Sequence, residues 1–192
     1  MIATPTALSL VAILLSAWSL VRNHFLGPRL RISLGDSIDL VRHTTGANVS
    51  FQLACVFTND GTDTGVIEGL LAVVHSPSSS ETKCLWRLFF AYENGAQAVA
   101  QSKPYSIPVL ARHTEFRGIQ FGHEGAWAEG TYNIELRGWV NRDMLHDAPN
   151  LLKAFSFTID KAMLPRLGPD LSPKLGPTLV PVAIERAIRR RP

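Results

Sequence analysis

The chain has 192 residues and a formal net charge of +3; hydrophobic residues make up 46% of it and charged residues 18%. This composition excludes a disordered or collagen-like chain, and two cysteines are too few for a disulfide-rich scaffold or a four-cysteine zinc site. Residues 32–165 hold 10 basic and 14 acidic residues, so the basic excess lies at the two ends and does not indicate a nucleic-acid-binding protein.

Residues 1–22 predict a single N-terminal transmembrane helix. Met1–Val21 contains no charged side chain, and about 20 helical residues rise roughly 30 Å, the thickness of a bilayer's hydrocarbon core. Trp18 would lie in the interfacial aromatic belt. The alternative is a cleaved signal peptide, but no basic residue precedes Arg22 and the region lacks a small-residue cleavage site. We therefore expect a retained anchor.

The flanks of this segment predict its orientation. Arg22, Arg29 and Arg31 all follow the apolar stretch, and the positive-inside rule then favours the cytoplasmic side for the rest of the chain. The extracytoplasmic side stays open as the alternative, because β-sandwich domains are common outside the cytoplasm.

Residues 23–161 predict a β-sandwich domain. Val49–Thr58 alternates apolar and more polar side chains, which indicates a strand with one buried face, and Asn94-Gly95 is typical of a tight hairpin turn. About eight short strands without a convincing helix between them indicate a mainly β, antiparallel sandwich. The other predicted strands are Val66–His75, Lys83–Tyr92, Tyr105–Leu110, Phe116–Phe121, Thr131–Val140 and Ala154–Ile159.

Two short motifs carry a resemblance. Phe57-Thr58-Asn59-Asp60-Gly61-Thr62 resembles the turn after an early strand in bacterial immunoglobulin-like modules, and Ala128 to Leu136 resembles their entry to a late strand. The resemblance implies an immunoglobulin-like sandwich in which Tyr132 folds back at a corner. It implies no particular activity.

No motif in the chain predicts catalysis, and we expect no enzyme activity, no cofactor and no metal. His113, Glu115, His123 and Glu124 are the best candidate cluster, but their spacing fits a metal site poorly and favours a solvated loop edge. Cys55 and Cys84 are expected on apolar strand faces, as buried thiols or as a disulfide. Trp127 and Trp139 are candidates for an exposed binding platform; for Trp139, which is out of phase with its strand, cover by a local loop is slightly favoured over cover by a partner or the tail.

The C-terminal part changes character. Residues 162–181 repeat leucine and proline every fourth position, which predicts an extended arm that either docks on a surface or stays free. Residues 182–192 form a short basic segment in which one or two helical turns are expected, facing lipid or an acidic partner. The candidate interface residues here are Leu167, Leu171, Leu175, Leu179, Arg189, Arg190 and Arg191.

The sequence therefore predicts a non-catalytic single-pass membrane protein. We expect an accessory or stabilising subunit of a larger membrane complex, with other membrane-protein subunits and the lipid bilayer as partners. The alternative is a membrane-tethered module that binds a sugar, a lipid or a metal in the cell envelope. Trp18, Arg22, Arg29 and Arg31 are the candidate contacts at the membrane.

Overall fold

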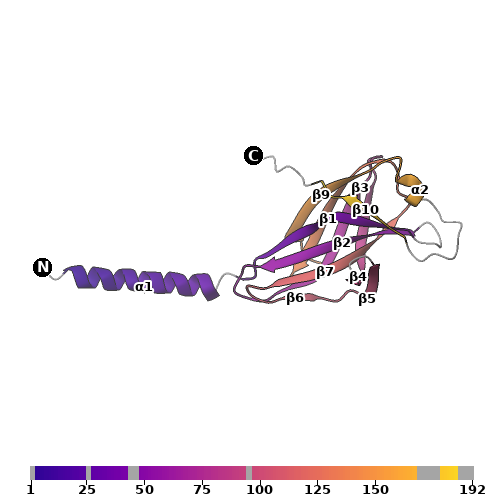
Figure 1. Cartoon of the computed structure of the whole chain (residues 1–192). Coiled ribbons are helices and arrows are strands. Elements are labelled where there is room, and N and C mark those ends of the chain that lie inside the picture. Colours follow the sequence, from indigo (N-terminus) through magenta and orange to yellow (C-terminus); the bar gives the residue numbers. More distant parts are fainter. Residues whose placement is uncertain (1–2, 25–26, 43–47, 94–96, 168–177, 186–192) are drawn as a thin grey trace.

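A computed structural model gives the architecture and describes residues 3–24, 27–42, 48–93, 97–167 and 178–185. An N-terminal helix projects from one end of a β-rich domain (Figure 1). The elements are α1 (Ala3–His24), β1 (Leu30–Arg42), β2 (Asn48–Asn59), β3 (Gly65–His75), β4 (Glu81–Glu93), β5 (Gln97–Ser102), β6 (Ile107–Val109), β7 (Thr114–Glu124), β8 (Gly130–Val140), β9 (Leu151–Ile159), α2 (Leu164–Leu167) and β10 (Thr178–Ala183).

All strand pairs are antiparallel, and the main path runs β10-β1-β2-β7-β4-β3-β8-β9. The path folds into two packed layers because β4 belongs to both. Leu85 and the residues before it pair with β3, whereas Trp86 and the residues after it pair with β7, with a register shift after Trp86. We call the layer of β10, β1, β2, β7, β4 and β5 sheet A, and the layer of β4, β3, β6, β8 and β9 sheet B. This confirms the mainly β, antiparallel class.

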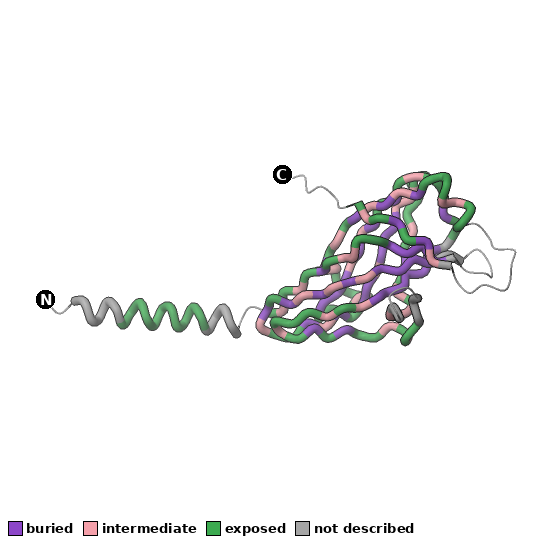
Figure 2. Tube along the Cα trace, in the orientation of Figure 1, coloured by how far each residue is buried: buried purple, intermediate pink, exposed green. Residues whose placement is uncertain are grey.

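The core lies between the two sheets, where strand faces of alternating apolar residues meet (Figure 2). Phe51 and Phe121 of sheet A stack with their ring centroids 5.2 Å apart, and Tyr132 and Phe157 of sheet B stack at the same distance. Trp127, in the β7–β8 loop, makes edge contacts with rings of both sheets. Burial of a large aromatic side chain contributes about 1.5–3 kcal/mol, so this cluster is a main source of cohesion between the layers.

The two ends of the main path, β9 and β10, almost meet and nearly close the sheet. Ser156 of β9 and Glu185 exchange backbone hydrogen bonds of 2.8 and 3.3 Å, and the hydroxyl of Thr158 donates to the Glu185 carboxylate at 3.0 Å. Edge strands invite pairing with other chains, and this seam covers part of both edges.

The C-terminal part agrees only in part with the predicted extended arm. Leu164–Leu167 forms the short helix α2, whereas residues 178–181 are extended and dock on the chain's own domain, which is one of the alternatives that the sequence left open. β10 pairs with β1 from Ser37↔Ala183 to Arg42↔Thr178, and Val180 and Val182 are buried in the core. Pro181 fits because β10 is an edge strand, where a missing N–H is tolerated. The predicted helical turns from Val182 onward are therefore wrong for residues 182–185, which belong to β10 and the seam.

The N-terminal helix is present as α1, and its described side chains, residues 9–19, are all exposed (Figure 2). Within the described part of the chain, no helix combines the length and the apolar character needed to cross a membrane. The predicted transmembrane span is thus not supported by this structure, although the helix itself lies where the sequence places it.

Most predicted strands are confirmed, with longer bounds. Glu93 pairs with Gln97 across the predicted Asn94-Gly95 turn, whose own residues lie outside the described part. The prediction missed β5 and β10 and gave no strand for Leu30–Arg42. β1 escapes recognition because a bulge between Leu34 and Ile38 interrupts its alternating pattern.

Candidate functional site

The end of the domain next to α1 is organised by Asn59, whose side chain is fully buried. Its Oδ1 accepts hydrogen bonds from the N–H of Arg29 at 3.1 Å and from the N–H of Gly61 at 2.9 Å. Its Nδ2 donates to the carbonyls of Asp63 at 2.8 Å and Val109 at 3.0 Å. One amide therefore joins the segment after α1, the β2–β3 turn and the end of β6.

The segment that follows α1 is held closely against this turn. The N–H of Asp60 donates to the carbonyl of Arg29 at 3.1 Å, and the side chains of Arg31 and Asp60 form an ion pair. A Cβ at Gly61 would lie only 2.6 Å from the Arg29 nitrogen and the Gly27 carbonyl oxygen. Only glycine allows so close a backbone approach. The position of the segment that follows α1 therefore depends on Gly61. We call residues 27–31 and 59–65 the base clamp.

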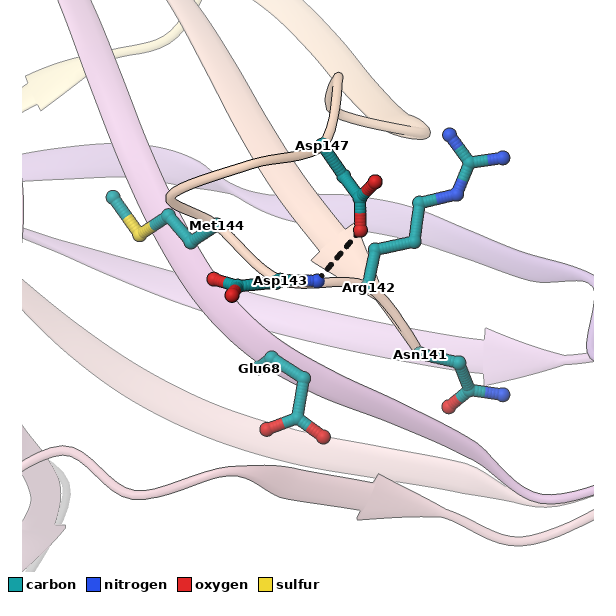
Figure 3. Close-up of a pocket in the computed structure, with 6 residues that line it drawn as sticks. All are labelled: Glu68, Asn141, Arg142, Asp143, Met144 and Asp147. Atoms are coloured by element: carbon teal, nitrogen blue, oxygen red, sulfur yellow. Dashed lines mark hydrogen bonds between the residues drawn. The ribbon is translucent and has the colours of Figure 1, made fainter.

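Two depressions that share Asn141 and Arg142 in their linings lie at this end of the domain, and the first borders the base clamp. The first, of about 410 Å³, is lined by the clamp residues Pro28, Arg29 and Leu30 together with Val140, Asn141, Arg142 and Asn150. The second, of about 540 Å³, lies between β3 and the β8–β9 loop (residues 141–150) and is lined by Glu68, Asn141, Arg142, Asp143, Met144 and Asp147 (Figure 3). Polar side chains dominate both.

The acidic groups around the second depression already have partners. The N–H of Leu145 donates to Asp143 Oδ1 at 2.8 Å, and His146 Nδ1 lies 2.6 Å from the other oxygen of that carboxyl. These bonds hold the pKa of the Asp143 carboxyl below its usual range. Asp147 Oδ2 accepts from the N–H of Asp143, and Glu68 accepts from the hydroxyl of Ser106. The carboxylates thus fix the loop, and the described residues contain no group of three or more ligands able to hold a metal.

A cysteine and a histidine meet inside the domain. Cys84 Sγ lies 3.7 Å from His123 Nδ1, and the His123 ring stacks on Trp127 with centroids 4.5 Å apart. A thiol beside an imidazole is a nucleophile pattern, but Cys84 is fully buried and His123 is 6% exposed. A substrate has no access there, so we interpret the pair as part of the core.

Cys55 and Cys84 are both buried, and no disulfide joins them in this structure, in agreement with the buried-thiol alternative. Burial raises the pKa of the Cys55 thiol to about 12. The weak metal cluster does not assemble either, because His113 lies in a loop before β7, Glu115 pairs with Arg117, and His123 is buried near the other end of β7.

The two tryptophans form no exposed platform, and for Trp139 the favoured alternative, cover by a local loop, is confirmed. Trp127 and Trp139 are each 6% exposed. Trp139 does point away from the core, as its phase predicts, but its Nε1 donates to the carbonyl of Asp147 at 2.7 Å. The local β8–β9 loop therefore covers it.

The structure places the predicted interface residues apart. Trp18 is exposed on α1, Arg29 and Arg31 lie exposed in the base clamp, and Leu167 is buried against the core. Leu179 is half-buried in β10, opposite Val41. The side chain of Arg22 and the residues Leu171, Leu175, Arg189, Arg190 and Arg191 lie outside what the structure describes.

Sequence reasoning missed a row of side chains across the outer face of sheet B. Leu85 of β4 pairs with Leu71 of β3, Leu71 with Arg137 of β8, and Arg137 with Leu152 of β9. Directly paired residues share a face, and Leu85 and Leu152 are 51% and 58% exposed. We call these four residues the sheet B row. No local pattern reveals it, because its members come from four strands.

The comparisons with known proteins identify no family. No known family and no curated protein matches the chain. Among solved structures, a Bordetella pertussis protein assigned as ApaA is similar over 86% of this chain and 98% of its own, with 9% identity and a TM-score of 0.35. Such a TM-score is too low to support an argument about fold or function.

Proposed function

We propose that this protein is a non-catalytic accessory subunit of a membrane protein complex. In this proposal, α1 holds the chain at the membrane and the outer face of sheet B docks a neighbouring subunit. The observation that carries the proposal is the exposed apolar surface of α1, which has no cover within the described part of the chain. The absence of an accessible reactive cluster among the described residues is consistent with a binding role.

The side chains of α1 support attachment to an apolar environment. Six large apolar residues on it are 52–68% exposed, and no acidic residue lies in its first turn. They spread over roughly half of the helix circumference, given about 100° per residue, whereas Ser9, Ala12, Ser16 and Ser19 share the remaining arc. An apolar arc suits lipid, and a face of small residues suits close packing against another helix in a membrane. The six are Leu10, Val11, Ile13, Leu14, Leu15 and Trp18.

The sheet B row supports contact with a protein. Exposed leucines at both ends flank Arg137, whose guanidinium binds the Glu135 carboxylate at 3.0 and 3.1 Å. This bidentate pair keeps the pKa of Glu135 below its ordinary value. Apolar side chains beside an oriented arginine are the composition that protein interfaces favour.

We also infer an immunoglobulin-like arrangement of the two sheets. The phenol of Tyr132 accepts a hydrogen bond from the N–H of Ala128 at 2.8 Å and lies 3.3 Å from its carbonyl oxygen. A tyrosine at the start of a late strand that bonds a few residues upstream is typical of the tyrosine corner. This contact supports the resemblance on which the inference rests.

Alkaline carbonate extraction of membranes from expressing cells tests the anchoring role of α1. We expect the wild type to stay in the membrane pellet and the double variant Leu10→Arg, Leu14→Arg to be released, because each arginine at the centre of a membrane helix costs about 2.5–3.5 kcal/mol. The matched control Leu10→Ala, Leu14→Ala keeps an apolar helix and should stay in the pellet. Release of the wild type by carbonate would contradict the proposal.

A further inference from the structure

Two loops at the α1 end of the domain present leucines to solvent. Leu145, in the β8–β9 loop, is 86% exposed, and Leu110, just after β6, is 57% exposed. β6 and β8 both pair with the first residues of β3, through Gly65↔Val109 and Ile67↔Val140. The two loops therefore flank the base clamp on either side.

The β8–β9 loop holds Leu145 outward by a dense set of bonds. Asp143 accepts from the N–H of Leu145 and contacts His146, while its own N–H donates to Asp147 at 2.9 Å. The Trp139 indole then ties Asp147 to β8. Because the loop is held in place and the Leu145 side chain is 86% exposed, this leucine adds little to the packing of the fold.

This end of the domain is also the end that a membrane-held α1 would bring close to lipid. Pro28 and Arg29 line one depression together with Asn141 and Arg142, so the β8–β9 loop lies beside the segment that leaves α1. Figure 1 shows α1 projecting from this end. A membrane that receives α1 therefore lies within reach of both loops.

We propose that Leu110 and Leu145 insert into the interfacial region of the phospholipid membrane to which α1 attaches. The inference rests on the proposed function. Exposed charges of both signs lie in the turns and loops at this end, with Arg112 close to Leu110 in the sequence, Arg142 and Asp143 close to Leu145, and Asp63 in the β2–β3 turn. This mixture matches a zwitterionic headgroup layer, whose phosphates face arginine and whose ammonium groups face carboxylate. Three membrane contacts, α1, Leu110 and Leu145, would then fix the orientation of the domain, which α1 alone would leave free to vary.

A fluorescent probe at position 145 tests this inference in the full chain. Leu145→Cys carries an environment-sensitive nitrobenzoxadiazole label, which the native Cys55 and Cys84 do not take up because both are fully buried. The protein is reconstituted into phosphatidylcholine vesicles with and without a nitroxide-labelled lipid. We expect a blue-shifted emission and at least about twofold quenching by the nitroxide.

Two further label sites make the outcomes distinct. Ser78→Cys, in the β3–β4 turn at the far end of the domain, should show neither effect. Leu14→Cys reports on α1 itself. Quenching at position 14 without quenching at position 145 would overturn the inference and leave the proposed function standing. Loss of quenching at both positions would overturn both, and equal quenching at position 78 would overturn the proposed orientation.

Discussion

Replacing Asn59 by alanine is expected to lower the free energy of unfolding by about 4 kcal/mol. The change leaves the N–H groups of Arg29 and Gly61 and the carbonyls of Asp63 and Val109 without their partner. An unsatisfied buried polar group costs about 1–3 kcal/mol, and water entering the space that the amide leaves would recover part of the sum. Losses of this size are rare for single substitutions.

Urea denaturation of the full chain in detergent measures this effect, with Asn133→Ala as the matched control. Asn133 is an exposed asparagine on β8, so its replacement should change the unfolding free energy by less than about 0.5 kcal/mol. Equal midpoints for the two variants would show that the base clamp does not depend on Asn59.

The second large effect is expected from Gly61→Ala, at about 2–3 kcal/mol. The new methyl group would lie 2.6 Å from two backbone atoms, Arg29 N and Gly27 O, and 2.9 Å from Pro28 Cα. Backbone cannot move aside as a flexible side chain can, and overpacking of this kind costs about 1–3 kcal/mol. We expect residues 27–29 to shift away, which breaks the hydrogen bond between Asp60 N–H and the Arg29 carbonyl.

Limited trypsin digestion reads out this displacement directly. The wild type should resist cleavage after Arg29, and the Gly61→Ala variant should be cut there while the rest of the domain survives. Gly27→Ala is the control, since a Cβ at that position meets no atom within 4 Å. The same cleavage pattern in both variants would rule out the close approach at Gly61.

The strands were predictable where local alternation is clean, as in Val49–Thr58, which lies within β2. They were not predictable where a second sequence pattern overlies the alternation of buried and exposed residues. In Thr178–Ala183, the buried Val180 and Val182 do alternate with the exposed Pro181 and Ala183, but the leucine–proline repeat obscures that signal. The partner strand β1 is more than a hundred residues away, and no local feature indicates it.

The candidate site was less predictable than the fold, for a physical reason. The motif around Asn59 indicates a turn, and the turn is there, but the amide also reaches Val109, 50 residues further along the chain. In the sequence, Leu145 looks like an ordinary loop residue and Leu110 like the end of a predicted strand; only the pairing of β6 and β8 with β3 brings them to the α1 end. Such clusters depend on topology, which residue patterns do not encode locally.

The native mass of the protein, extracted from its own membranes in a mild detergent, tests the proposed subunit role most directly. We expect a stable assembly well above the 21.1 kDa of the single chain, which Leu85→Glu, Leu152→Glu reduces to the monomer by charging the sheet B row. Phe116→Glu, at a 52% exposed position on sheet A, should leave the assembly intact. A wild type that runs as a monomer, or an assembly that survives the double substitution, would contradict the account.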